Sequence, residues 1–212
     1  MGSNKPIGIF DSGIGGLTVA NSINKFLPNE KIIYFGDTLH LPYGSKSPEK
    51  INDYSEKIVQ FLLEKNCKAI VFACNSASST SFDSITKKYF EQTTFFNVID
   101  PVIDYIKSSK NIKTVGVIGT EATINSQVYS KKISKTNKNI LVKPMATPLL
   151  ASLIEDNKSI FFSNSILKKY LESKLLKGID SLILGCTHYP IISQEISSFF
   201  KDSIEIISSD KL

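Results

Sequence analysis

The sequence predicts an α/β protein built from two pseudo-symmetric lobes with mostly parallel sheets and a cleft between them. Short apolar runs alternate with amphipathic helical patterns along the chain, as in proteins that wrap helices around parallel strands. Two pairs of segments also repeat at offsets of 108 and 112 residues. With 42% hydrophobic and 21% charged residues, the 212-residue chain has the composition of an ordinary globular protein.

Eight apolar runs read as short buried strands, because each is rich in β-branched or aromatic residues and ends at polar or small residues. In chain order they are 6–10, 31–35, 68–73, 94–98, 114–119, 139–144, 180–185 and 203–207. Apolar side chains at helical spacing predict helices over 48–65 and 164–177. Leu167, Tyr170, Leu171 and Leu175 form the stripe of the second helix, and Gly178 is placed as its C-terminal stop.

The repeats suggest where the lobes divide. "IGIFDSGIGG" at 7–16 resembles "VGVIGTEAT" at 115–123, and the segment 56–76 resembles 168–188 in giving helix, turn, strand and then cysteine. We therefore expect a first lobe over 1–98, to which 207–212 return, and a second lobe over 99–206.

Cys74 and Cys186 each follow a predicted strand in these repeats. In α/β sheets the ligand crevice lies beyond the carboxyl ends of the strands, where helix N-termini point. We expect the helix dipole to lower each thiol pKa toward neutrality, and the two thiols to face one bound molecule from opposite sides. A thiol redox or hydrolase protein is an alternative, and Cys67 is interpreted as a buried apolar side chain.

Composition excludes several other classes. The 25 basic residues, all lysine, are interleaved with 20 acidic ones, which does not favour a nucleic-acid surface. No run approaches the roughly 20 apolar residues of a membrane span, so we expect no membrane association and a cytoplasmic location. Neither thiol has the Cys-x-x-Cys or paired-histidine spacing of a metal site.

The absence of arginine also limits how a ligand can be bound. Without arginine, a carboxylate ligand must be held by hydroxyls, amides and helix N-termini.

The loop "FDSGIGG" at 10–16 fits neither of two common phosphate motifs. Thr18 stands where a dinucleotide fingerprint needs its third glycine, and no Gly-Lys-Ser/Thr follows for a Walker loop. Asp11 is open to two interpretations, a nucleophile or a helix cap. The glycines allow a ligand to approach the backbone closely.

Five segments together resemble the glutamate racemases of the aspartate/glutamate racemase superfamily. They are "GIFDSGIGGLTV" (8–19), "YFGDTLHLPYGSKS" (34–47), "ACNSAS" (73–78), "VGVIGTEATINS" (115–126) and "LGCTHYP" (184–190). The resemblance implies racemization of glutamate without a cofactor, by two cysteines acting as two bases, and a role in supplying D-glutamate for peptidoglycan. A non-catalytic amino-acid-binding module and a racemase of a related acidic amino acid such as aspartate are the alternatives.

The resemblance also implies roles for individual residues. Cys74 would act on D-glutamate and Cys186 on L-glutamate, with Asp11 beside the first thiol and His188 assisting the second. Glu155 resembles an acid that helps the second thiol, although an exposed helix glutamate fits its pattern as well. His188 could instead cap or pack. Residues matching the group's ligand contacts, each of which could also be a plain cap, are Asp11, Ser12, Pro42, Tyr43, Gly44, Asn75, Ser76, Thr120, Thr123, Thr187 and His188.

The quaternary state is left open by the sequence, and a homodimer is one option. The chain ends at "IISSDKL", whereas members of this group usually continue into a helix that packs on the first lobe. We therefore expect a shortened member or a truncated chain.

Overall fold

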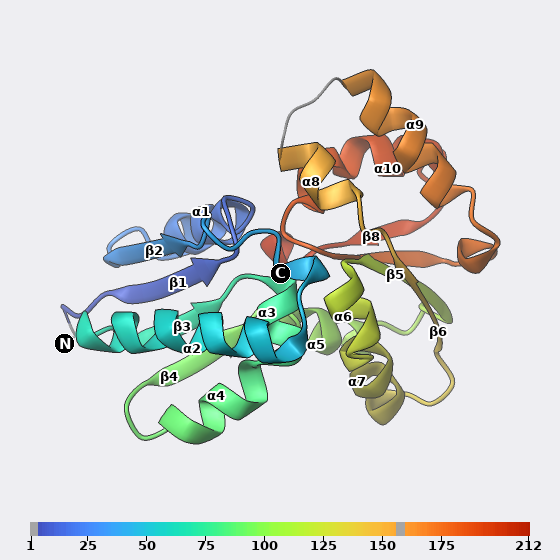
Figure 1. The fold of residues 1–212 in the computed structure, drawn as a ribbon. Helices are drawn as coiled ribbons and strands as arrows, with labels where there is room; N and C mark the ends of the chain where they lie inside the picture. The colour runs from blue at the N-terminus through green and yellow to red at the C-terminus, as the bar shows by residue number, and fades with distance from the viewer. Residues whose placement is uncertain (1–3, 156–159) are drawn as a thin grey trace.

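The computed structural model describes residues 4–155 and 160–212. They form two four-stranded, all-parallel sheets, with strand orders β2-β1-β3-β4 and β6-β5-β7-β8. The two orders are identical when the second set is renumbered from its own first strand. Figure 1 shows the sheets as two lobes, the first in blue to green and the second in yellow-green to red. The fold class expected from the repeats is therefore confirmed.

All eight predicted strands are present, each within two residues of its expected bounds. The first sheet contains β1 (Ile7–Asp11), β2 (Ile32–Gly36), β3 (Ala69–Phe72) and β4 (Thr94–Asn97). The second contains β5 (Thr114–Gly119), β6 (Leu141–Ala146), β7 (Ser181–Gly185) and β8 (Glu205–Ile207). The central strands β1, β3, β5 and β7 are built from apolar runs because both of their faces are covered.

Helices and short 3-10 turns connect the strands. The helices are α1 (Leu17–Phe26), α2 (Pro48–Glu64), α3 (Asn75–Thr80), α4 (Phe82–Tyr89), α5 (Asp100–Ser108), α6 (Glu121–Asn125), α7 (Val128–Thr136), α8 (Leu150–Glu155), α9 (Ile160–Leu171) and α10 (Ser193–Phe199). The 3-10 turns are Tyr43–Ser45, Lys174–Leu176, Tyr189–Ile192 and Ser209–Lys211. The predicted helix 48–65 is confirmed as α2, where Ser47 accepts a hydrogen bond from the Lys50 amide and Pro48 occupies the first turn.

The predicted helix 164–177 is wrong at its end. Helix α9 stops at Leu171, and Ser173 begins a 3-10 turn by accepting a hydrogen bond from the Leu175 amide. Leu175 is consequently 57% exposed, while Leu176 is buried in the core in its place. Gly178 does adopt a left-handed conformation, with φ +73°, but it follows the 3-10 turn and not the helix.

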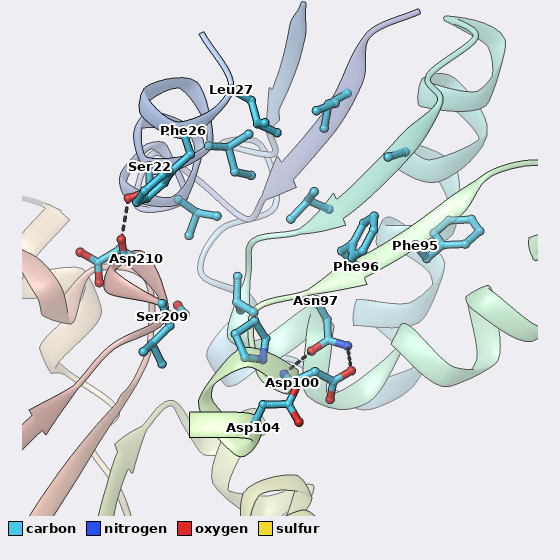
Figure 2. Close-up of a pocket in the computed structure, with 18 residues that line it drawn as sticks. Ser22, Phe26, Leu27, Phe95, Phe96, Asn97, Asp100, Asp104, Ser209 and Asp210 are labelled. Carbon is cyan, nitrogen blue, oxygen red and sulfur yellow. Dashed lines mark hydrogen bonds between the residues drawn. The ribbon is translucent and has the colours of Figure 1, made fainter. Parts of the chain in front are cut away.

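The two faces of the first sheet are covered unequally. On one face, α2 and α4 pack against Phe10, Ile70 and Phe72 in a large core. On the other, α1 packs against a smaller cluster that includes Ile9 and Val71. A groove of about 500 Å³ remains on this second face, between α1, β4, α5 and the C-terminal turn (Figure 2). No predicted catalytic residue lines this groove.

The second lobe is covered on both faces. Helices α8, α9 and α10 pack on one side of its sheet, and α5 and α7 pack on the other, where Ile103 and Ile133 meet Val117. Within the described ranges, no helix has the length and apolar character needed to cross a bilayer.

The chain returns to the first lobe after β8. The Ser22 hydroxyl on α1 donates a hydrogen bond of 2.5 Å to the Asp210 carbonyl, a contact visible in Figure 2. This bond joins residues 188 positions apart. The C-terminal turn is thereby held against the helix that precedes β2.

Candidate active site

The polar segments of the sequence gather where the central strands end. Asp11 is the last residue of β1, and Cys74 follows β3 and precedes the first turn of α3. In the second lobe Thr120 follows β5 and caps α6, and Cys186 follows β7. Because all four strands are parallel within their sheets, these residues lie at the carboxyl edge of each sheet, as predicted for a ligand crevice.

Both thiols line one small cavity between the lobes. The cavity has a free volume of about 20 Å³, which is room for a single water molecule and little more. Its walls are formed by Ser12, Pro42, Tyr43, Gly44, Cys74, Asn75, Ser76, Thr120, Ala151, Glu155, Cys186, Thr187 and His188. The lobes must therefore move apart to admit a ligand of several atoms.

Two of the predicted site residues, Asp11 and Thr123, do not reach the cavity wall. They lie directly behind it, hydrogen-bonded to wall residues Thr187 and Thr120. The structure adds Ala151, which the sequence analysis missed. Ala151 precedes Glu155 by four residues on α8, so helical spacing from that glutamate is the signal that could have found it.

Cys74 is buried, and its thiol donates a long hydrogen bond of 3.7 Å to the Ser12 hydroxyl. Burial, and after it the nearby Asp11 carboxylate, raise the pKa of the Cys74 thiol to about 12. A hydrogen bond from the Ala77 amide, in the first turn of α3, acts in the opposite direction. The expected lowering toward neutrality is therefore wrong, because desolvation outweighs the helix N-terminus.

Cys186 is also buried, and burial again raises the thiol pKa above its ordinary value, against the lowering by the His188 amide. Its sulfur lies 3.7 Å from Nδ1 of His188. Nε2 of His188 lies 3.4 Å from Oε2 of Glu155, an ion-pair distance without hydrogen-bond geometry. Thiol, imidazole and carboxylate thus form a row on the second-lobe side of the cavity.

Asp11 joins the two lobes from behind the cavity. Its Oδ2 accepts hydrogen bonds of 3.1 Å from the amides of Gly13 and Gly16, which shape the glycine-rich loop. Its Oδ1 accepts a bond of 3.3 Å from the hydroxyl of Thr187 in the second lobe. The carboxylate is fully buried, and these three donors satisfy it.

Hydroxyl groups form a second link between the lobes. The oxygens of Ser76 and Thr120 lie 2.8 Å apart, and Thr120 also donates to Thr123. Thr120 in turn accepts from the Thr123 amide, as a helix cap does. Neutral hydroxyls of this kind are the groups that we expect to donate hydrogen bonds to a carboxylate ligand in a chain that contains no arginine.

Three glycines allow the first lobe to approach the second. A Cβ atom at Gly13 would lie 2.7 Å from Oε1 of Glu155, and one at Gly44 would lie 2.5 Å from Cβ of Thr120. A Cβ atom at Gly15 would lie 2.7 Å from the ring of His188. The glycines are thus required by close approach across the cleft.

Cys67 has a different environment from the other two cysteines. It is buried in the first core, near Gly8 and Leu62, and does not line the cavity. Its interpretation as an apolar core residue is confirmed.

Fold and site together define a class of enzyme: a two-lobed α/β protein that presents two thiols from duplicated strand ends to one enclosed cavity. The family model for Asp/Glu/Hydantoin racemase matches residues 7–210. The chain belongs to this family.

Several known proteins are similar to the chain over nearly its whole length. A glutamate racemase of Geobacter metallireducens is 39% identical over 97% of this chain and 76% of its own. The structure of glutamate racemase from Francisella tularensis in complex with D-glutamate is 40% identical, with a TM-score of 0.89 over 98% of this chain and 77% of that one. Glutamate racemase RacE1 of Bacillus anthracis is 34% identical, with a TM-score of 0.92 over 97% of this chain and 77% of its own.

Proposed function

We propose that the chain interconverts L- and D-glutamate without a cofactor, with Cys74 and Cys186 as the two bases. One observation carries the proposal: the two thiols lie at equivalent strand ends of duplicated lobes and line the same cavity. Glutamate held between them could lose its α-proton to one thiolate, and the planar carbanion formed in this way could gain a proton from the opposite thiol. The relatives of about 39% identity, all glutamate racemases, support glutamate over aspartate as the substrate.

In the reaction, one cysteine must be a thiolate and the other a thiol. The thiolate takes the α-proton and becomes an S–H group, while the electron pair left on Cα delocalises into the adjacent carboxylate. The opposite S–H then delivers its proton to the other face of Cα and becomes the thiolate. No atom is gained or lost, and the protein ends with its two sulfurs exchanged in protonation state.

Burial raises the pKa of both thiols, so the active thiolate needs help when substrate binds. The α-ammonium group of glutamate brings a positive charge into the cavity and favours a thiolate there. His188, 3.7 Å from Cys186, can accept the proton of that thiol. By analogy with the family, Cys186 acts on L-glutamate and Cys74 on D-glutamate.

The carbanion is the costly species, and preorganised donors must stabilise its charge. The free N–H of the Asn75 amide can bind a substrate carboxylate directly, whereas the cavity hydroxyls of Ser76, Thr120 and Thr187 can donate to the carboxylates after turning from their present partners Thr120, Thr123 and Asp11. Asp11 and Thr123 act from behind the wall, through Thr187 and Thr120. Glu155 orients His188.

We further propose that the lobes are units of 1–98 and 99–206, with 207–212 belonging to the first. The packing of α5 in the second core and the bond from Ser22 to Asp210 support these boundaries. A glutamate racemase of this kind would supply D-glutamate for peptidoglycan from the cytoplasm.

Isotope exchange tests the reaction. Incubating either enantiomer of glutamate with the protein in D2O should give α-deuterated glutamate of both hands. Cys74→Ser and Cys186→Ser should each abolish racemization, and normal racemization by either variant would refute the two-base mechanism.

Two further measurements separate the alternatives. Calorimetric binding of glutamate without exchange would indicate a binding module, and faster exchange of aspartate than of glutamate would indicate an aspartate racemase. A single cysteine that reacts rapidly with iodoacetamide, unprotected by glutamate, would favour thiol redox or hydrolase chemistry.

A further inference from the structure

The side-chain amide of Asn75 has a hydrogen-bonded oxygen and an unpaired nitrogen. Its Oδ1 accepts a hydrogen bond, but its Nδ2 has no partner among the residues that the structure describes. Asn75 is only 3% exposed and lines the cavity next to Cys74. A buried amide nitrogen without an acceptor is costly, so this group indicates a ligand with an acceptor oxygen at that place.

The partner of Oδ1 is Tyr129, from the other lobe. The Tyr129 hydroxyl on α7 donates to Oδ1 at 2.7 Å, and the tyrosine is 4% exposed. Burial raises the pKa of this phenol, which keeps it protonated and able to donate at neutral pH. If the amide were reversed, the hydroxyl proton would lose its acceptor, and a carbonyl oxygen would face the cavity.

A strained turn directs Tyr129 toward the cleft. Gln127, between α6 and α7, has φ 59° in the left-handed region, which costs a residue other than glycine about 1 kcal/mol or more. Its amide donates to the Ile124 carbonyl, and Ser126 accepts from the Val128 amide to start α7. The turn places Tyr129 one residue after this start, pointing inward.

We propose that Tyr129 is a positioning residue for substrate: by holding Oδ1 of Asn75, it fixes Nδ2 toward a substrate carboxylate. The inference rests on the proposed function, which it deepens by assigning the donor and its support. Because Asn75 and Tyr129 come from different lobes, the amide is oriented only when the lobes are closed. The donor is therefore completed by closure itself.

Tyr129→Phe removes the hydroxyl and leaves the ring. In this variant the amide of Asn75 can rotate and present its oxygen to the carboxylate. We expect KM for both enantiomers to rise about 10-fold, the equivalent of ~1.4 kcal/mol, with kcat changed less than about 3-fold. Tyr89→Phe is the matched control, since Tyr89 is a buried tyrosine of the first lobe that hydrogen-bonds Glu56 and Gln60. It should leave both constants unchanged.

A double-mutant cycle shows whether Tyr129 acts through Asn75. If it does, Tyr129→Phe should have no further effect on KM once Asn75 is alanine. An unchanged KM in the single variant, or an equal loss in the Asn75→Ala background, would overturn the proposal. So would a fall in kcat alone.

A measurement on the unmodified protein covers the case in which Tyr129→Phe does not fold. In ¹⁵N-labelled protein, the side-chain NH₂ signal of Asn75 should shift when D-glutamate is added, and an unshifted signal in the saturated protein would overturn the proposal. Isotope exchange by the wild-type chain is run in parallel. Absence of exchange there refutes the proposed function, whereas normal exchange with an unaffected Tyr129→Phe variant refutes this inference alone.

Discussion

Alanine at Gly15 would place a methyl group where the first lobe touches His188. The added Cβ would lie 2.7 Å from Nδ1 and Cε1 of His188 and from Oγ1 of Thr187. Ordinary contacts of this kind begin near 3.4 Å, so the loop and the ring must separate by roughly 0.7 Å. His188 is buried and lies against Glu155, which leaves the ring little room to retreat.

The displacement falls directly on the row of groups beside Cys186. Nδ1 of His188 is 3.7 Å from the sulfur, and errors near 1 Å in catalytic geometry cost about 100-fold in rate. We therefore expect Gly15→Ala to lower kcat by about 10- to 100-fold in both directions, measured by circular dichroism of glutamate racemization. An unchanged kcat would refute the reasoning.

Gly8→Ala is the control that shows what steric crowding alone does when it does not displace His188. Its Cβ would lie 3.0 Å from the Cys67 sulfur and 3.1 Å from Leu62, in the core of the first lobe and away from the cavity. We expect a loss of about 1–3 kcal/mol in the free energy of unfolding, with kcat retained. If Gly8→Ala reduces kcat as much as Gly15→Ala does, the loss reflects general strain and not the position of His188.

Three further predictions concern the buried groups. Burial holds the pKa of Cys74 near 12 in the folded protein, against about 8.5 in the unfolded chain. The protonated thiol therefore stabilises the fold fully below pH 8.5, and this stabilisation is lost as the pH rises toward 12. Across that window the free energy of unfolding, from urea titrations, should fall by ~1.4 kcal/mol per pH unit more than in Cys74→Ala, and equal slopes would contradict this. At pH 7.4 iodoacetamide should label Cys74 and Cys186 about 1,000-fold more slowly than in the unfolded chain, as read by mass spectrometry; rapid labelling of the native protein would contradict their burial. Thr187→Val, which removes the hydrogen bond to Asp11, should cost about 1 kcal/mol in the same urea titrations, whereas Thr187→Ser should cost less.

The strands and their duplication could be predicted from the sequence because they depend on local pattern. Each central strand is a short apolar run, and the repeated segments carry one thiol each to the same place in the fold. The end of α9 could not be predicted in this way. It depends on a side-chain bond by Ser173 and on burial of Leu176 in place of Leu175, and both follow from packing of the second lobe.

The composition of the cavity was largely predictable, but its electrostatics were not. The helix N-terminus beside Cys74 does lower the thiol pKa, as the sequence suggested, through the Ala77 amide. Closure of the second lobe over the thiol removes water and reverses the net effect. Tyr129 was missed for a related reason, since its contact with Asn75 spans 54 residues and two lobes.

The duplicated sheets place the two thiols alike but surround them differently, Cys74 with Ser12 and Cys186 with His188. Mirror-image substrates have equal free energies in water, so their equilibrium constant is unity. For a racemase, kcat/KM must then be the same in both directions, however unlike the two halves are. The different neighbours of the two thiols can therefore make kcat and KM differ between the two directions, but kcat and KM must then differ by the same factor. The two lobes therefore had to keep each cysteine sulfur in the same position, while the residues around each sulfur were free to diverge.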